Sequence, residues 1–236
     1  MAPDLRLSAA GSHLLGGFSR GSMTDSANSK LTATLIHGLE WLYDRAIKGV
    51  PTLDSASDLA ISYQRRFPSS DTAVDALIKW QTAKAGTASF VSSFGGVLSL
   101  PVALPANLAS VTYIQLRMIA AIAHLRGHDI RSDPVRTVAL ACLGGARVAD
   151  MVKEFGVRFG TQLAHEALKR VSGDGLKQIN QAIACRLVAV TGTATPISFS
   201  KFVPVIGGVV AGGIDAAVTR AYGHTAKRLF QPIAAY

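Results

Sequence analysis

Charged residues are scarce in this chain of 236 residues. Only 17 % of the side chains are Asp, Glu, Lys or Arg, whereas about 25 % is usual for a soluble domain. Hydrophobic residues make up 49 % of the chain, and the mean hydropathy is +0.29. This composition indicates a helical protein with a sizeable apolar surface, buried in its own core or in contact with a membrane.

Cysteine is almost absent as well. Cys142 and Cys185 are the two cysteines of the chain, and each lies in an apolar, helix-like context. Two cysteines in such contexts do not indicate a disulfide framework. They predict reduced, buried and unreactive thiols.

The sequence also lacks the patterns of strands and of nucleotide-binding loops. No segment of useful length alternates with a period of two, and neither a P-loop nor a G-x-G-x-x-G motif occurs. Apolar residues instead recur every three or four positions, for example at Leu35, Leu39 and Leu42. We therefore predict an all-α fold, a single bundle of about eight to ten helices, with no cofactor.

The first thirty residues show no apolar periodicity. Residues 1–30 are rich in glycine and serine and contain no apolar core of a secretory signal. They are predicted to form a flexible tail ahead of a helical domain over residues 31–236. The triplet Gly21-Ser22-Met23 also resembles a cloning remnant, which would make residues 1–22 foreign to the protein.

Two apolar blocks, 86–123 and 203–219, are interrupted by glycine and proline. The first carries no charge between Gly86 and Gln115, and the second contains one acid, Asp215. Proline breaks a helix, and a Gly-xxx-Gly stripe lets two helices approach closely. We expect two broken helical hairpins packed by Pro101, Pro105, Pro204, Gly207, Gly208, Gly212 and Gly213.

Positive charge accompanies the more apolar part of the chain. Residues 1–100 carry a net charge of +1 and residues 101–236 a net charge of +8. An anionic lipid surface attracts such a sequence by about 1 kcal/mol per basic residue. The scattered basic residues lack the dense runs typical of nucleic-acid binding, so no nucleic-acid partner is predicted. The residues expected to contact the membrane are Lys201, Arg220, Lys227 and Arg228.

Asp215 is the most informative polar residue, because it is the lone acid of the second apolar block. Arg220 and His224 follow one and two helical turns later. We expect Asp215 and His224 to be buried, with Asp215 either forming an ion pair that fixes the packing or serving a function in lipid.

Two weak catalytic patterns are present. His124 and His128 lie one helical turn apart, with Asp129 as a third candidate metal ligand. The alternative is a polar corner with capping roles, because Gly127 is expected to end the helix. Ser198 and Lys201 fit an S-x-x-K pattern, but no partner motif follows. No catalytic residue is assigned.

Two longer blocks resemble a known family. They are GGVLSLPVALPANL with YIQLRMIAAIAHLRGHDI, and KFVPVIGGVVAGGIDAAVTRAYGHTAKRLF. Their order and spacing resemble the EcsC family over roughly residues 31–231. The resemblance implies a helical, membrane-associated or accessory protein. Members often carry Asn where this chain has Asp215. The matching positions are Pro101, Pro105, Gly127, Lys201, Pro204, Gly207, Gly208, Asp215, Gly223 and Phe230.

Three functions remain open at this point. The first is a non-enzymatic, lipid-binding protein that is cytoplasmic and peripheral to the inner membrane, and that inserts its apolar hairpins. The second is a soluble helical adaptor that docks a protein partner. The third is a hydrolase using His124 and His128. Periodicity cannot separate the first two, because a helix buried in protein and one buried in lipid are equally apolar.

Overall fold

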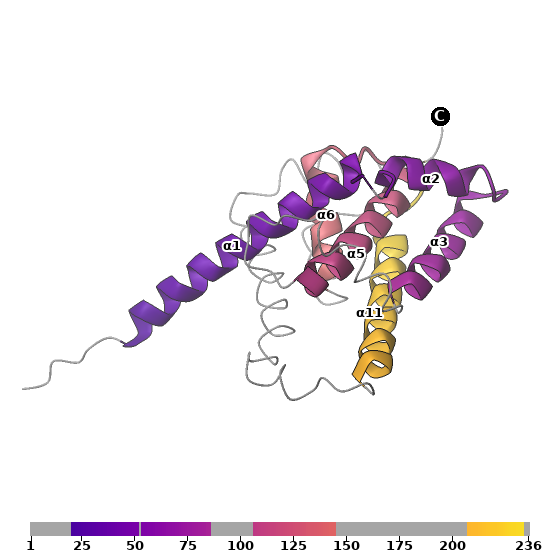
Figure 1. Ribbon diagram of the computed structural model, residues 1–236. Helices are drawn as coiled ribbons and strands as arrows, with labels where there is room; N and C mark the ends of the chain where they lie inside the picture. Colours follow the sequence, from indigo (N-terminus) through magenta and orange to yellow (C-terminus); the bar gives the residue numbers. More distant parts are fainter. Residues whose placement is uncertain (1–19, 52, 86–105, 145–206, 234–236) are drawn as a thin grey trace, which may run out of the picture.

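The computed structural model describes residues 20–51, 53–85, 106–144 and 207–233, and these ranges hold six α-helices (Figure 1). Apart from one isolated bridge between Val50 and Leu53, no β pairing occurs in these ranges. The predicted all-α bundle is confirmed. The predicted total of eight to ten helices also covers residues 145–206, which lie outside the described residues.

Helix α1 (Arg20–Lys48) begins inside the segment predicted to be a flexible tail, so residues 20–30 are helical. Its predicted apolar stripe is buried, with Leu42 and Ala46 both at 0 % exposure. The helix ends where Gly49 takes a φ of 81°, and the Gly49 N–H donates to the Arg45 carbonyl at 2.8 Å. Glycine tolerates this left-handed conformation, which explains the sharp stop.

Helices α2 (Ala56–Gln64) and α3 (Ser70–Ala85) both start with serine caps. Ser55 Oγ accepts from the Asp58 N–H at 3.1 Å, and Ser69 Oγ accepts from the Thr72 N–H at 3.2 Å. These side chains satisfy backbone donors that a helix start leaves unpaired. Asp71 lies in the first turn of α3, where an acid suits the positive end of the helix dipole.

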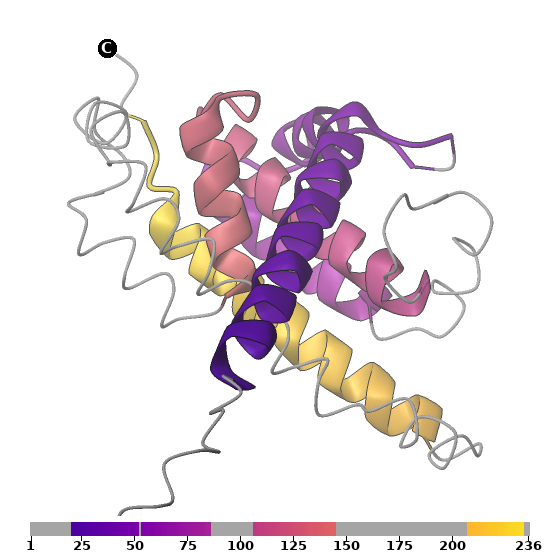
Figure 2. The same cartoon turned by 90° about the vertical axis from the view of Figure 1, so that its left-hand side faces the viewer.

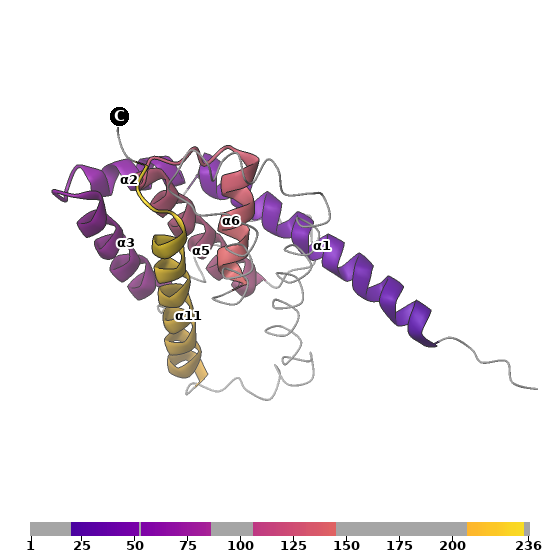
Figure 3. The same cartoon turned by 180° about the vertical axis from the view of Figure 1, so that it is seen from behind.

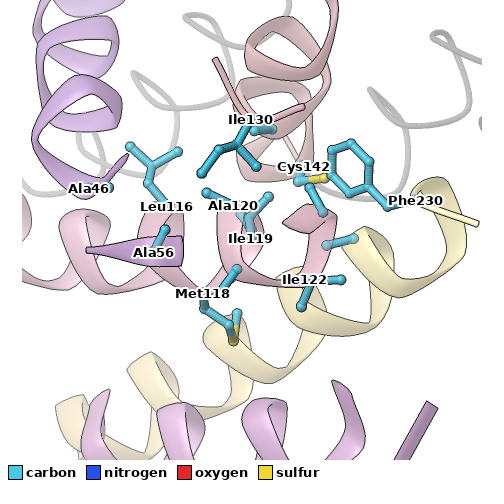
Figure 4. Close-up of a cluster of buried hydrophobic side chains, with 14 of the residues drawn as sticks. Ala46, Ala56, Leu116, Met118, Ile119, Ala120, Ile122, Ile130, Cys142 and Phe230 are labelled. Carbon is cyan, nitrogen blue, oxygen red and sulfur yellow. The ribbon is translucent and has the colours of Figure 1, made fainter. Parts of the chain in front are cut away.

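Helix α5 (Ala106–Leu125) is the centre of the bundle and packs against α1, α2, α3, α6 and α11 (Figure 2). Every side chain from Ala109 to Ala123 is buried, which is typical of a helix surrounded by protein. Figure 4 shows Leu116, Met118, Ile119 and Ile122 of this helix inside the core.

Helix α6 (Asp133–Leu143) starts with Ser132 at the cap position and Pro134 in the first turn. The Ser132 hydroxyl donates to the Asp129 carbonyl at 2.7 Å and makes no capping bond to the helix. Cys142 is fully buried against the core near Phe230 (Figure 4), as expected for this thiol.

Helix α11 (Gly207–Leu229) is one continuous helix of 23 residues (Figure 3). The predicted hairpin over 203–219 is therefore wrong for the described part, because the four glycines beginning at Gly207 all lie within a single helix. Antiparallel packing on α3 is shown by Lys227 beside Asp75 and by Gly223 beside Ile78. None of the helices in the described ranges is both long and apolar enough to cross a membrane.

Candidate functional site

The end of α5 forms a polar corner that joins three helices. The Schellman turn at Gly127, with a φ of 84°, ends the helix as predicted. The Gly127 N–H donates to the His124 carbonyl at 2.9 Å, and the His128 N–H donates to the Ala123 carbonyl at 3.0 Å. The Ser70 hydroxyl of α3 donates to the Leu125 carbonyl at 2.9 Å. This corner therefore satisfies carbonyls that the end of α5 would otherwise expose.

Arg126 is the charged centre of this corner. Its side chain is 3 % exposed, and its Nη2 lies 2.6 Å from Asp71 Oδ1 on α3. Its carbonyl accepts from the Ile233 N–H at 3.0 Å, which holds the segment after α11 in place. The arginine thus links α5, α3 and the end of α11.

The weak candidate metal ligands His124, His128 and Asp129 lie at or just after the end of α5. His128 Nε2 lies 2.8 Å from the Gln231 carbonyl, and its ring contacts Phe230 edge-on with 5.3 Å between ring centroids. Asp129 Oδ1 accepts from the Arg131 N–H at 3.0 Å. Among the described residues, no three His, Cys, Asp or Glu side chains are grouped to hold a metal. The polar corner with capping roles is what the structure contains.

Lys227 belongs to the same corner and is paired with acids of the protein itself. Its Nζ lies 2.6 Å from Asp75 Oδ1 and 3.9 Å from Asp71 Oδ1, and its side chain is 29 % exposed. Two neighbouring carboxylates offset the positive charge of this ammonium, so its attraction for a lipid headgroup is weak. Lys227 is therefore a poor candidate for membrane contact.

The solvent-facing side of α11 carries the other predicted basic residues. Arg220, His224 and Arg228 are all exposed and follow one another at spacings of four, so they share a face of the helix. The prediction that His224 is buried is therefore wrong. Towards the helix start the same face becomes apolar, with Ile214 59 % exposed.

Asp215 of α11 is half-buried. Burial raises the pKa of its carboxyl above the ordinary value, because desolvation disfavours the charged form. No ion pair or hydrogen bond joins it to another described residue, Arg220 and His224 included. The expected ion pair is absent from the part of the chain that the structure describes.

Gly213 and Gly223 are the glycines of α11 whose surroundings are described, and only Gly223 makes a close helix contact. A methyl group built on Gly213 would meet nothing within 4 Å, so no neighbour approaches there. A methyl group on Gly223 would lie 2.8 Å from Ile78 Cγ1 of α3. Gly207, Gly208 and Gly212 lie in the helix, but their surroundings are not among those that the structure describes.

Several predicted residues lie outside the described ranges altogether. These are Pro101, Pro105, Cys185, Ser198, Lys201 and Pro204.

Trp80 is a surface residue that the sequence reasoning missed. It is 59 % exposed on α3, which is unusual for the largest apolar side chain, and Lys79 and Lys84 on the same helix are exposed as well. Because α3 and α11 are antiparallel, the second half of α3 lies towards the start of α11. Trp80 and Ile214 are therefore at the same end of this helix pair. The sequence contained a signal for this exposure. Trp80 follows Ile78 by two positions and comes directly after Lys79, so it falls outside the apolar stripe of the helix.

Comparison with known proteins gives one result. No curated protein and no solved structure matches the chain. The model of the EcsC protein family matches residues 21–232, which is nearly the whole chain and includes the start of α1. The match also contains both blocks that resembled this family in the sequence. The chain belongs to the EcsC protein family.

Proposed function

We propose that this protein is a non-enzymatic, peripheral membrane protein that binds an anionic lipid surface through α11 and the adjoining end of α3. The observation that carries the proposal is the exposure of two large apolar side chains, Trp80 and Ile214, at the same end of this helix pair. Exposed aromatic and aliphatic side chains flanked by basic residues are typical of interfacial helices.

The positions of the basic residues support binding through this end of the α3–α11 pair. Lys79 and Lys84 accompany Trp80 on α3, and Arg220 lies less than two turns beyond Ile214 on α11. Such side chains extend their charged ends to headgroups while their stems cover apolar surface. Arg228 lies on the same face of α11, about 12 Å beyond Arg220 at 1.5 Å per residue. It would reach the surface only if α11 lies along the membrane rather than end-on.

The shape of the bundle also supports it. The first part of α11 extends past the neighbouring ends of α3 and α5 in all three views (Figures 1, 2 and 3). An apolar helix start that projects from a bundle can enter the interface without disturbing the core. A cytoplasmic location on the inner membrane and a role for Lys201 complete the proposal; Lys201 precedes α11 in the sequence.

Vesicle flotation of the purified full-length chain tests the proposal. Vesicles of phosphatidylcholine alone are compared with vesicles that also contain phosphatidylglycerol, each at low and high salt. We expect binding to the anionic vesicles that weakens with salt but persists in part, because burial of Trp80 and Ile214 is not screened. Absence of binding under all four conditions would contradict the proposal and favour an adaptor that docks a protein partner.

Matched variants locate the surface. Trp80→Ser and Ile214→Ser should each weaken binding, whereas Ile233→Ser, at the opposite end of α11 and 43 % exposed, should not. Arg220→Gln should weaken anionic binding about fivefold, the equivalent of about 1 kcal/mol, while Arg65→Gln at the end of α2 should have no effect. An equal effect of Arg228→Gln and Arg220→Gln would indicate that α11 lies flat on the surface.

A further inference from the structure

Four polar side chains are buried together where α2, α3 and α5 meet. Tyr63 of α2 is 8 % exposed, Gln81 of α3 is 2 % exposed, and Tyr113 and Arg117 of α5 are 0 % and 4 % exposed. Polar groups so deeply buried are nearly always hydrogen-bonded. We call these four residues the Arg117 cluster.

Among the described residues, Arg117 has no counter-ion at contact distance. Its Nε is buried without a hydrogen-bond partner, and no ion pair joins its guanidinium to any described carboxylate. Asp54 and Asp58 are near enough to stabilise its charge electrostatically, but both side chains are exposed, so water screens them. Arg126, the other deeply buried arginine, has its aspartate at 2.6 Å. Among the described residues, Arg126 therefore has an acid at contact distance and Arg117 does not, whereas an Nε without a hydrogen-bond partner occurs in Arg117, Arg126 and Arg136 alike.

Gln81 repeats this pattern on the neighbouring helix. Its Nε2 is buried and lacks a hydrogen-bond partner of good geometry among the described residues. The Gln81 side chain nevertheless lies beside the Tyr63 hydroxyl. Arg117 and Arg66 also interact electrostatically with that hydroxyl. Hydrogen-bond donors of α2, α3 and α5 therefore lie close together in the Arg117 cluster.

The chemistry of the cluster is unbalanced. The Arg117 guanidinium and the Gln81 NH₂ group are donors, whereas the Gln81 carbonyl and the tyrosine hydroxyls can also accept, and none of these groups carries a negative charge. What the cluster lacks is an acceptor with several oxygens and a negative charge. Carboxylate and phosphoryl groups match this need, and arginine binds both with two parallel hydrogen bonds.

We propose that the Arg117 cluster is a binding site for an oxyanion, the carboxylate or phosphoryl group of a small ligand or of a lipid. Arg117 supplies the charge, Gln81 Nε2 donates a hydrogen bond, and the Tyr63 hydroxyl borders the site. The exposed Asp54 and Asp58 interact electrostatically with Arg117, so the site lies close to the surface near the start of α2. Burial lowers the pKa of Arg117, and a bound oxyanion would offset that desolvation.

This site does not depend on the proposed membrane surface. Vesicle binding is assigned to exposed residues such as Trp80 and Arg220, whereas oxyanion binding is assigned to buried residues of α3 and α5. Either proposal can fail while the other stands, because the two sets of residues do not overlap.

Thermal unfolding of the full-length chain tests the oxyanion site. Inorganic phosphate and monomeric dihexanoyl phosphatidic acid are titrated separately, with ionic strength held constant by sodium chloride. A ligand that binds only the folded state raises the unfolding midpoint and does so saturably. Saturation with inorganic phosphate would identify a free oxyanion as sufficient. Saturation with the phosphatidic acid alone would identify a lipid headgroup, and both results support the site.

Arg117→Met is the decisive variant, with Arg65→Met as its control of equal charge at the exposed end of α2. Arg117→Met should lose the ligand-induced shift while its ligand-free midpoint stays equal or rises, because an unpaired buried charge is removed. Arg65→Met should keep the shift. An unchanged shift in Arg117→Met, or no saturable shift with either probe in the unmodified chain, would overturn the proposal.

Gln81→Leu keeps the test informative if Arg117→Met does not fold. Loss of one hydrogen bond to a charged group should raise the half-saturating ligand concentration about tenfold. Asp58→Asn removes a competing negative charge and should lower that concentration. Unfolding of Arg117→Met together with an unchanged half-saturation in Gln81→Leu would assign Arg117 a purely structural role and reject the site.

Discussion

Gly223 of α11 lies directly against Ile78 of α3, so closely that an added methyl group would be 2.8 Å from Ile78 Cγ1 and 3.1 Å from its Cγ2. These two carbons are attached to Cβ, so rotation of the side-chain end does not relieve the contact. Gly223→Ala should therefore separate the two helices and lower the free energy of unfolding by about 1–3 kcal/mol. Urea unfolding measures this. In an Ile78→Ala background the added cost should shrink, and an equal cost there would show that the contact is not the cause.

Gly213 provides the opposite case on the same helix. A methyl group there meets nothing within 4 Å, and alanine restricts the unfolded chain more than glycine does. Gly213→Ala should raise the free energy of unfolding by about 0.5–1 kcal/mol. A loss of stability in the same urea experiment would mean that a neighbour does approach this face of α11.

The ion pair between Arg126 and Asp71 should stabilise the corner more than the pair between Lys227 and Asp75. The Arg126 side chain is 3 % exposed, whereas the Lys227 and Asp75 side chains are 29 % and 56 % exposed. Asp71→Asn should cost about 1–3 kcal/mol, because it leaves a buried guanidinium without its charged partner. Asp75→Asn should cost about 0–1 kcal/mol. Equal costs in chemical denaturation would show that burial of Arg126 does not matter.

Asp215 should make the protein less stable as the pH rises. Its folded pKa lies above its unfolded value, which is about 3.9. Between these two values the native state binds more protons than the unfolded state, so stability falls with increasing pH. Asp215→Asn should remove this dependence and be more stable than the unmodified chain at neutral pH. A less stable Asp215→Asn would indicate a partner for the ionised carboxylate.

Cys142 should resist thiol reagents in the folded protein. It is fully buried, and burial raises the pKa of its thiol far above the usual range, so the reactive thiolate is absent at neutral pH. Peptide mass spectrometry after alkylation should find Cys142 unmodified without denaturant and fully modified in denaturant. Modification under native conditions would mean that α6 opens readily from the core.

Local chemistry along the chain sufficed for several helix ends, whereas the helical residues 20–30 and the unbroken α11 were not predicted. A glycine that tolerates positive φ stops a helix wherever it occurs, so Gly49 and Gly127 could be recognised without knowing any neighbour. Ser132 and Pro134 defined the start of α6 in the same way. Two blocks of sequence also sufficed for the family, since the order and spacing of their glycines and prolines needed no coordinates.

Tertiary structure alone decided which side of each helix meets protein and which meets water. Gly213 and Gly223 are alike in sequence, yet only Gly223 touches another helix, because α3 crosses α11 at that level. Lys227 and Arg228 are adjacent, and one reaches Asp75 while the other faces solvent. Arg117 and Arg126 are both buried, and only Arg126 has an acid at contact distance. Such pairings depend on residues far apart in the chain, and helical periodicity carries no information about them.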